Sequence, residues 1–207
     1  MKTIIDKRKE LEIRASTLIE RKIHEYLKKQ KSVTIALPGG TSVSGIFSLL
    51  KRQKIPWHKI HIFMADERIV PLNDDKSNYK ILSDSLLDYL LKQKLIPGRN
   101  LHPYIYFNLP SEQGTDAYKN ELRELSHKFD IVLLSSGEDG HVASLFPNHE
   151  TIKNQSDFFI FTDNSPKIPK KRISASRKLL QKSGTALLLF LGDKKKNAYN
   201  NFKNQEL

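Results

Sequence analysis

The chain has 207 residues, 38% hydrophobic and 28% charged, and this size and composition suit one globular domain over 1–207. The formal net charge of +12 suits anionic partners. The lysines, however, run along the whole chain without interleaved aromatic residues, which argues against a nucleic-acid surface. The absence of cysteine excludes disulfides and thiolate metal sites, and the longest apolar stretch, 186–191, is too short to span a bilayer. We expect a cytoplasmic protein with no membrane or nucleic-acid partner.

Short apolar runs alternate with amphipathic segments along the chain. Helical spacing of apolar residues predicts helices over 11–27, 43–50, 79–91 and 113–125, and a Lys-rich helix from Asp193. Apolar runs predict strands over 33–37, 60–65, 129–134, 158–162 and 185–191. The alternation predicts an α/β fold, a three-layer αβα arrangement with a doubly wound, mostly parallel sheet. The sheet is Rossmann-like, but the dinucleotide fingerprint is missing.

Three of these strands end in segments that carry chemistry, and parallel strands would bring all three to one edge of the sheet. After the strand over 33–37 come Gly39, Gly40 and Thr41. Two glycines let the backbone approach an anion closely, and the hydroxyls of Thr41 and Ser42 add donors. An ordinary glycine-rich turn with a Ser/Thr cap is the alternative interpretation.

A carboxylate and a guanidinium follow the strand over 60–65. Together, Asp66 and Arg68 can position a hydroxylated, anionic substrate. A surface ion pair accounts for the same residues.

The third segment, after the strand over 129–134, contains a histidine between glycine-rich turns. Histidine titrates near neutral pH, so His141 can take a proton from water and return it to a leaving oxygen. Asp139, two residues away, can orient the ring or raise its basicity. A structural histidine is the alternative. The other histidines lack partners at ligand spacing, and we expect no metal site.

Taken in this order, the segments resemble the 6-phosphogluconolactonases, which share a superfamily with the glucosamine-6-phosphate deaminases. The matching stretches are 37–41, 66–68, 77–78, 130–134, 137–141 and 143–147, with weaker matches at 172–174 and 192–195. The Asp-Gly-His segment at 139–141 running into Ser-Leu-Phe-Pro at 144–147 is the most specific part. The resemblance extends over most of the chain, so it does not depend on one motif.

Two positions separate the branches of this superfamily. The deaminases carry a tyrosine after their Asp-Glu pair and a glutamate after the histidine segment, where it serves ring opening. Here those positions are Arg68 and Phe146, which favours a lactonase. An amino-sugar-phosphate deaminase or isomerase is the alternative. The chain also departs from the usual pattern at Ser135, where the family has a glycine.

The resemblance implies hydrolysis of 6-phospho-D-glucono-1,5-lactone to 6-phosphogluconate in the oxidative pentose phosphate pathway, with no cofactor. It implies His141 as the general base oriented by Asp139, with Arg68 near the carbonyl and Asp66 on a sugar hydroxyl. The phosphate would be held by the Gly39–Thr41 loop with Arg172 and Lys195. The partner is therefore a phosphorylated sugar lactone, and we expect a monomer or weak dimer. A nucleic-acid binder and an inactive member of the family are the remaining hypotheses.

Overall fold

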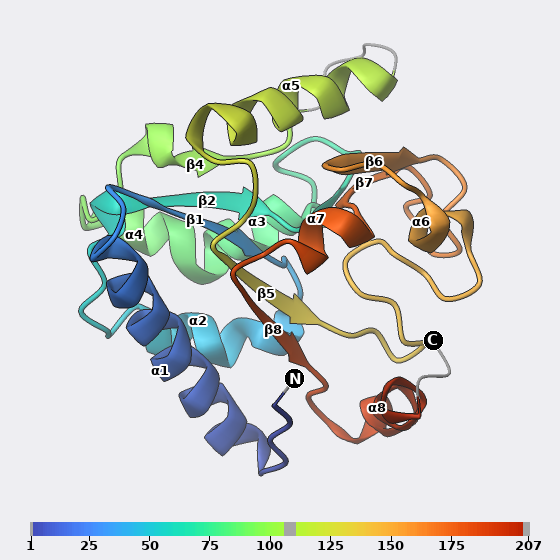
Figure 1. The fold of residues 1–207 in the computed structure, drawn as a ribbon, viewed down its shortest axis with the longest axis horizontal. Coiled ribbons are helices and arrows are strands. Elements are labelled where there is room, and N and C mark those ends of the chain that lie inside the picture. The colour runs from blue at the N-terminus through green and yellow to red at the C-terminus, as the bar shows by residue number, and fades with distance from the viewer. Residues whose placement is uncertain (1, 106–110, 205–207) are drawn as a thin grey trace.

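The structure, a computed structural model, describes residues 2–105 and 111–204, without the side chains of 111–113. Five strands form a sheet in the order β4-β2-β1-β5-β8, and every neighbouring pair is parallel. Their bounds are β1 Val33–Leu37, β2 Ile60–Met64, β4 Leu101–His102, β5 Ile131–Ser135 and β8 Thr185–Leu189. The predicted parallel sheet is confirmed, and the carboxyl ends of β1, β2 and β5 lie at one edge (Figure 1).

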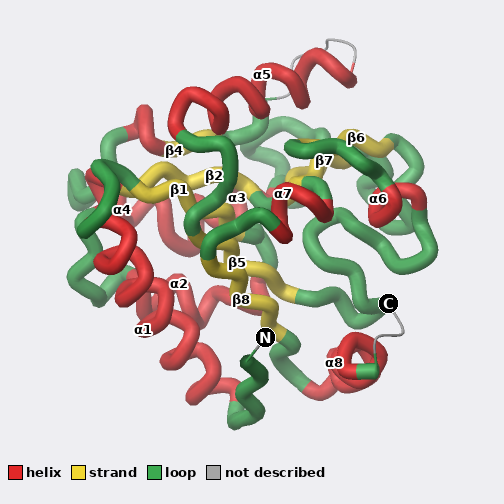
Figure 2. Tube along the Cα trace, viewed as in Figure 1, coloured by secondary structure: helices red, strands yellow, loops and turns green. Residues whose placement is uncertain are grey.

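Helices cover both faces of this sheet, so the predicted three-layer α/β fold is confirmed (Figures 1 and 2). Side chains alternate in direction along β1: Ile35 and Leu37 join one hydrophobic core, and Ala36 joins the other. The first core packs against α1 (Arg8–Leu27), α2 (Ser44–Leu50) and the helical segment formed by α3 (Asn78–Leu82), a π-helical turn (Ser83–Leu87) and α4 (Asp88–Lys92). The second core packs against α5 (Ser111–Leu125) and α7 (Arg177–Gln181).

A second, antiparallel sheet lies beside the first and has the order β3-β7-β6. Its strands are β3 Asp66–Arg68, β7 Arg172–Ala175 and β6 Phe159–Thr162. The predicted strand over 158–162 is confirmed as β6, and the segment that follows the predicted strand over 60–65 forms β3, for which no strand was predicted. The chain leaves the main sheet at Ala65, whose N–H still bonds the Leu37 carbonyl at 2.9 Å, and enters the second sheet immediately afterwards.

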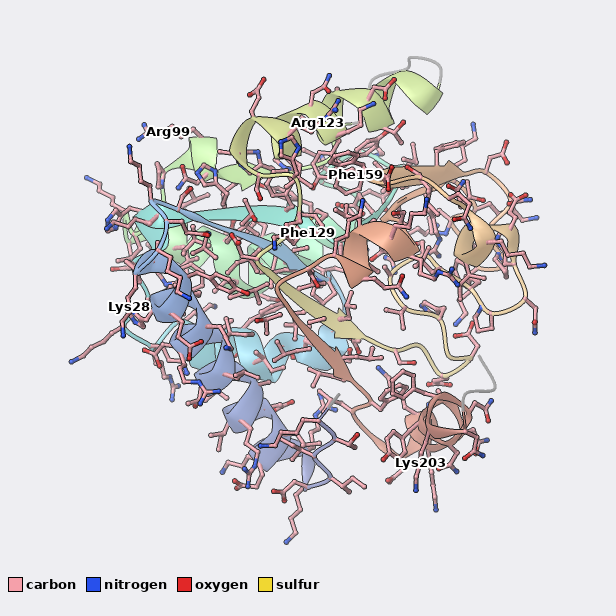
Figure 3. All side chains as sticks on the ribbon, viewed as in Figure 1. Lys28, Arg99, Arg123, Phe129, Phe159 and Lys203 are labelled. Atoms are coloured by element: carbon pink, nitrogen blue, oxygen red, sulfur yellow. The ribbon has the colours of Figure 1, made fainter. Side chains whose placement is uncertain are left out.

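The remaining elements are short. They are α6 Glu150–Lys153, α8 Lys196–Lys203 and the 3₁₀ turns Thr41–Val43, Trp57–Lys59, Gly98–Asn100 and Asp193–Lys195. Among the described helices, none combines the length and apolar character needed to cross a membrane. Lys28, Arg99 and Lys203 lie at the periphery in Figure 3, whereas Phe129 and Phe159 lie inside with ring centroids 6.2 Å apart. The labelled cations thus come from separate parts of the surface, as expected for lysines spread along the chain.

Candidate active site

A cavity of about 190 Å³ opens where the carboxyl ends of β1, β2 and β5 meet the second sheet. The turns that follow β1 and β5 form two of its walls, and residues from β3, the start of α3, β7 and the 3₁₀ turn after β8 complete it. The predicted residues Gly39, Gly40, Asp66, Arg68, His141, Arg172 and Lys195 all line it. The fold therefore gathers in one place residues that lie more than a hundred positions apart in the sequence.

His141 and Asp139 form a hydrogen-bonded pair at this cavity. Nδ1 of His141 lies 2.5 Å from Oδ1 of Asp139, and the imidazole ring packs against Phe146 with centroids 4.9 Å apart. Because an ionised carboxylate only accepts hydrogen bonds, this contact places the proton of the neutral ring on Nδ1. Nε2 is then the basic nitrogen, and the ring, 19% exposed, lines the cavity.

The electrostatics of the pair favour a neutral histidine and an ionised aspartate at neutral pH. Burial lowers the pKa of His141 below its usual value, and the opposing effect of Asp139 does not restore it. Burial alone would raise the pKa of Asp139, but hydrogen bonds from His141 and Lys167 outweigh it and bring that pKa to about 2. A neutral imidazole beside a fixed carboxylate is the form that accepts a proton from water.

The local backbone explains why the two side chains meet. The Gly137 N–H donates to the His141 carbonyl at 2.7 Å, which closes a tight turn, and Gly140 adopts a φ of 88° within it. A Cβ on Gly137 would lie 2.2 Å from both Cε1 and Nδ1 of His141. The glycine at 137 therefore leaves the space that the imidazole occupies.

Three cations line the cavity without a neutralising carboxylate. Within the described part of the chain, neither Arg68, Arg172 nor Lys195 forms an ion pair. Arg68 donates to the Lys76 carbonyl at 2.8 Å, and its Nε is buried with no hydrogen-bond partner among the described residues. Unpaired cations around a cavity are the arrangement that a phosphate or carboxylate group would satisfy.

Arg172 is buried and its guanidinium is fixed from two sides. Its Nε donates to the Pro169 carbonyl at 2.9 Å, and Nη1 lies 3.4 Å from the hydroxyl of Ser144. That hydroxyl donates to Asp66 at 2.7 Å. Burial lowers the pKa of Arg172 and the neighbouring Arg68 adds to this effect. An anion in the cavity would offset both the burial of the Arg172 charge and its repulsion by Arg68.

The glycine turn after β1 has different roles at its successive positions. A Cβ on Gly39 would lie 2.3 Å from Cα of Asn78, so this glycine is required by packing against α3. A Cβ on Gly40 would have only the Ser42 hydroxyl nearby, at 3.5 Å, so its backbone faces open space. Thr41 is exposed and lies outside the cavity lining, where Ser42 from the same turn stands instead.

Hydroxyl groups connect this turn to Lys195. The Ser42 and Ser135 hydroxyls lie 2.9 Å apart, and Nζ of Lys195 donates to Ser135 at 2.9 Å. Burial lowers the pKa of Lys195, and the positive charge of Arg8 lowers it further. The serine at 135, where the family usually has glycine, thus places an additional hydroxyl in the cavity wall.

Sequence reasoning missed several residues of this region. Lys167 contacts both members of the histidine pair, and Ser135 and Ser144 supply hydroxyls. Asn78 lines the cavity and donates to Asp66 at 3.2 Å. Ser135, Ser144 and Asn78 lie in segments that the sequence singled out, although no role was assigned to them, whereas Lys167 reaches the site only through a long-range contact.

Glu67 is buried next to the site and serves the backbone rather than the cavity. Its carboxylate accepts hydrogen bonds from the N–H groups of Arg68, Asn78 and Tyr79 and from the Ser77 hydroxyl. Burial raises its pKa to about 7 in spite of these donors. The carboxylate therefore ties β3 to the start of α3. No cluster of three or more His, Cys, Asp or Glu side chains in the described residues is arranged to hold a metal ion.

The sequence from residue 6 to residue 206 matches the family described as glucosamine-6-phosphate isomerases/6-phosphogluconolactonase. The chain belongs to this family. It is 36% identical to a 6-phosphogluconolactonase of Borreliella burgdorferi over 84% of this chain and 74% of that one. It is 35% identical to a 6-phosphogluconolactonase of Thermotoga maritima over 86% of this chain and 78% of that one.

The fold agrees with a solved member of the family. The crystal structure of a 6-phosphogluconolactonase from Thermotoga maritima superposes with a TM-score of 0.82 at 30% identity, covering 98% of this chain and 88% of the other. Phe146, at the position where the resemblance leads us to expect a glutamate in a deaminase, is buried, and its ring centroid lies 4.9 Å from that of His141 and 5.6 Å from Cζ of Arg172. The side chain at this position is thus apolar and handles no protons.

Proposed function

We propose that this chain hydrolyses 6-phospho-D-glucono-1,5-lactone to 6-phosphogluconate, with His141 as the general base. The single observation that carries the proposal is one cavity lined by His141, whose ring is hydrogen-bonded to Asp139, and by three cations that form no ion pair with the described carboxylates. The similar proteins from Borreliella burgdorferi and Thermotoga maritima are 6-phosphogluconolactonases, which supports the same reaction.

The phosphate of the substrate is anchored by Lys195, Arg172 and the backbone of the Gly39–Gly40 turn. These groups come from three separate elements that line the cavity together with His141. Holding the remote phosphate places the lactone carbonyl near the imidazole. The reaction between them then takes place within one complex and no longer depends on a chance encounter of the two groups. Asp66 accepts a hydrogen bond from a sugar hydroxyl, because its carboxylate is fixed by Ser144 and Asn78.

The chemical step needs a base, a nucleophilic water and a site for negative charge. Nε2 of His141 removes a proton from water as the oxygen attacks C1, and Arg68 stabilises the negative charge that develops on the carbonyl oxygen. When the tetrahedral intermediate collapses, the bond from C1 to the ring oxygen breaks and the imidazolium returns the proton to that oxygen. The product carboxylic acid then ionises and releases one proton to solution.

The alternative, an amino-sugar-phosphate deaminase, requires an additional acid–base group. Ring opening of an amino sugar and release of its nitrogen need a carboxylate that moves protons beside the histidine. At that position Phe146 is 1% exposed and offers only an aromatic face. This favours the lactonase over the deaminase.

The test is lactone hydrolysis followed by proton release, corrected for the spontaneous rate, with wild type and His141→Ala. A positioned general base contributes about two to four powers of ten, so the variant should lose at least about a hundredfold in kcat with little change in KM. A variant within about threefold of wild type removes the histidine from the reaction. Release of ammonia from glucosamine 6-phosphate would establish the deaminase instead.

A further inference from the structure

Lys167 lies against the histidine pair but outside the cavity. Its Nζ is 3.0 Å from Oδ2 of Asp139 and 3.5 Å from Nδ1 of His141. The side chain is 42% exposed and is absent from the cavity lining. It therefore contacts the groups proposed for catalysis from outside the cavity lining.

The two oxygens of Asp139 have different partners. Oδ1 contacts His141 at 2.5 Å and Oδ2 contacts Lys167 at 3.0 Å. A carboxylate held at only one oxygen can rotate about its own bond, whereas one held at both oxygens keeps its plane and direction. Lys167 thus fixes the acceptor that determines which nitrogen of His141 carries the proton.

The segment that carries Lys167 is itself fixed in position. The backbone carbonyl of Lys167 accepts hydrogen bonds from the Ser165 hydroxyl at 3.0 Å and from Nη2 of Arg172 at 3.4 Å, and the Pro169 carbonyl binds Nε of Arg172 at 2.9 Å. Arg172 is itself part of the cavity wall. The same guanidinium therefore connects that wall to the backbone segment from which Lys167 reaches Asp139.

We propose that Lys167 is a positioning residue for the proposed lactonase reaction: its ammonium holds Asp139 in the orientation that keeps the proton of His141 on Nδ1 and Nε2 free. This inference rests on the function proposed above. The charge has a second effect of the same origin, because a cation 3.5 Å from the ring disfavours the imidazolium form.

The charged groups that face His141 come from four elements. Asp139 lies on the same turn, Lys167 on the segment before β7, Asp66 on β3 and Arg172 on β7. Burial lowers the pKa of His141 most, Asp139 and Asp66 raise it, and Lys167 lowers it. Removal of Lys167 alone should therefore raise the pKa of the base.

The experiment compares Lys167→Met, Lys167→Arg and the control Lys170→Met, whose lysine lies on the same segment with an exposed side chain. Rates of lactone hydrolysis are measured against pH. For Lys167→Met the acidic limb of kcat/KM should move up by roughly one pH unit. The kcat on the plateau should fall roughly tenfold as the ring loses its fixed geometry, with KM nearly unchanged.

Lys167→Arg keeps the charge and should restore most of both effects, and Lys170→Met should behave as wild type. A ¹⁵N NMR spectrum of the histidines should show the His141 Nδ1–H form in wild type and a mixture of the two neutral forms in Lys167→Met. If Lys167→Met does not fold, the same measurements on Lys167→Gln decide the question.

A wild-type pH profile and plateau in Lys167→Met would overturn the positioning role and leave an ordinary surface ion pair. If His141→Ala is inactive while Lys167→Met is unaltered, only this inference fails. If His141→Ala is fully active, the proposed base and its positioning fail together.

Discussion

Replacing Gly137 by alanine changes the site without removing any group that takes part in the proposed reaction. A Cβ at this position would lie 2.2 Å from Nδ1 and Cε1 of His141 and 2.5 Å from Oδ1 of Asp139. Ordinary van der Waals contact begins at 3.4 Å, so the imidazole or the turn must move by roughly 1 Å. The Asp139–His141 hydrogen bond at 2.5 Å would not survive such a shift unchanged.

A displacement of this size in a catalytic group costs about a hundredfold in rate, so we expect kcat to fall by that order with KM little affected. The cations that anchor the phosphate lie on other elements. Proton-release kinetics measure both constants, and urea unfolding should show a loss of about 1–3 kcal/mol, because the alanine methyl overlaps the His141 ring and the Asp139 carboxylate.

Gly98→Ala is the matched control, since a Cβ there meets no atom within 4 Å. It should leave rate and stability unchanged. A Gly137→Ala enzyme with kcat within about threefold of wild type would show that the geometry of the histidine pair is not what the reaction depends on.

Two other predictions concern titration and stability. Because burial lowers the pKa of His141 and only the neutral ring accepts a proton, kcat/KM should be constant near pH 7 and decrease on acidification with a midpoint below 6.5; a midpoint above 6.5 in the pH–rate profile would contradict this. Glu67→Gln places an amide N–H₂ among N–H donors from Arg68, Asn78 and Tyr79, so we expect a loss of about 1–3 kcal/mol in urea unfolding at pH 8. Glu124→Gln, at an exposed position, is its control, and an equal stability of the two variants would refute the structural role of Glu67.

The main sheet could be predicted because buried parallel strands are nearly continuous apolar runs. Val33–Leu37 was predicted with the bounds that the structure has, and all five of its residues are buried. The second sheet gave no such signal. Asp66–Arg68 is a strand only because Glu67 and Arg68 pair with Ile173 and Arg172, more than a hundred residues later. Local propensity cannot report a pairing of that range.

The same distinction applies to the site. The neighbourhood of Asp139 and His141 follows from a turn of five residues, so a local pattern was sufficient to single them out. Lys167 lies 26 residues after His141 in the sequence. Its segment also carries Lys170, Lys171 and Arg172, and the sequence does not show which of these cations points toward the pair. In the turn after β1, Ser42 lines the cavity and Thr41 does not. The two residues are adjacent and both carry a hydroxyl, so their composition does not show which of them faces the cavity.

The pairing of β3 with β7 brings two positive charges together at the cavity, and their repulsion explains why the site favours an anion. It sets Arg68 directly opposite Arg172 in an antiparallel pair, where like charges repel. The Arg68 guanidinium donates to the backbone carbonyl of Lys76. The Arg172 guanidinium donates to the backbone carbonyls of Lys167, Ile168 and Pro169. Neither forms an ion pair with a carboxylate of the described residues. Carbonyl groups orient a cation but do not neutralise it, and the charge of Arg68 acts on Arg172 more strongly than that of Asp66, so an anion in the cavity would reduce the repulsion. An anionic substrate would relieve it, and part of its binding energy would then come from the repulsion that the pairing of β3 with β7 creates within the second sheet.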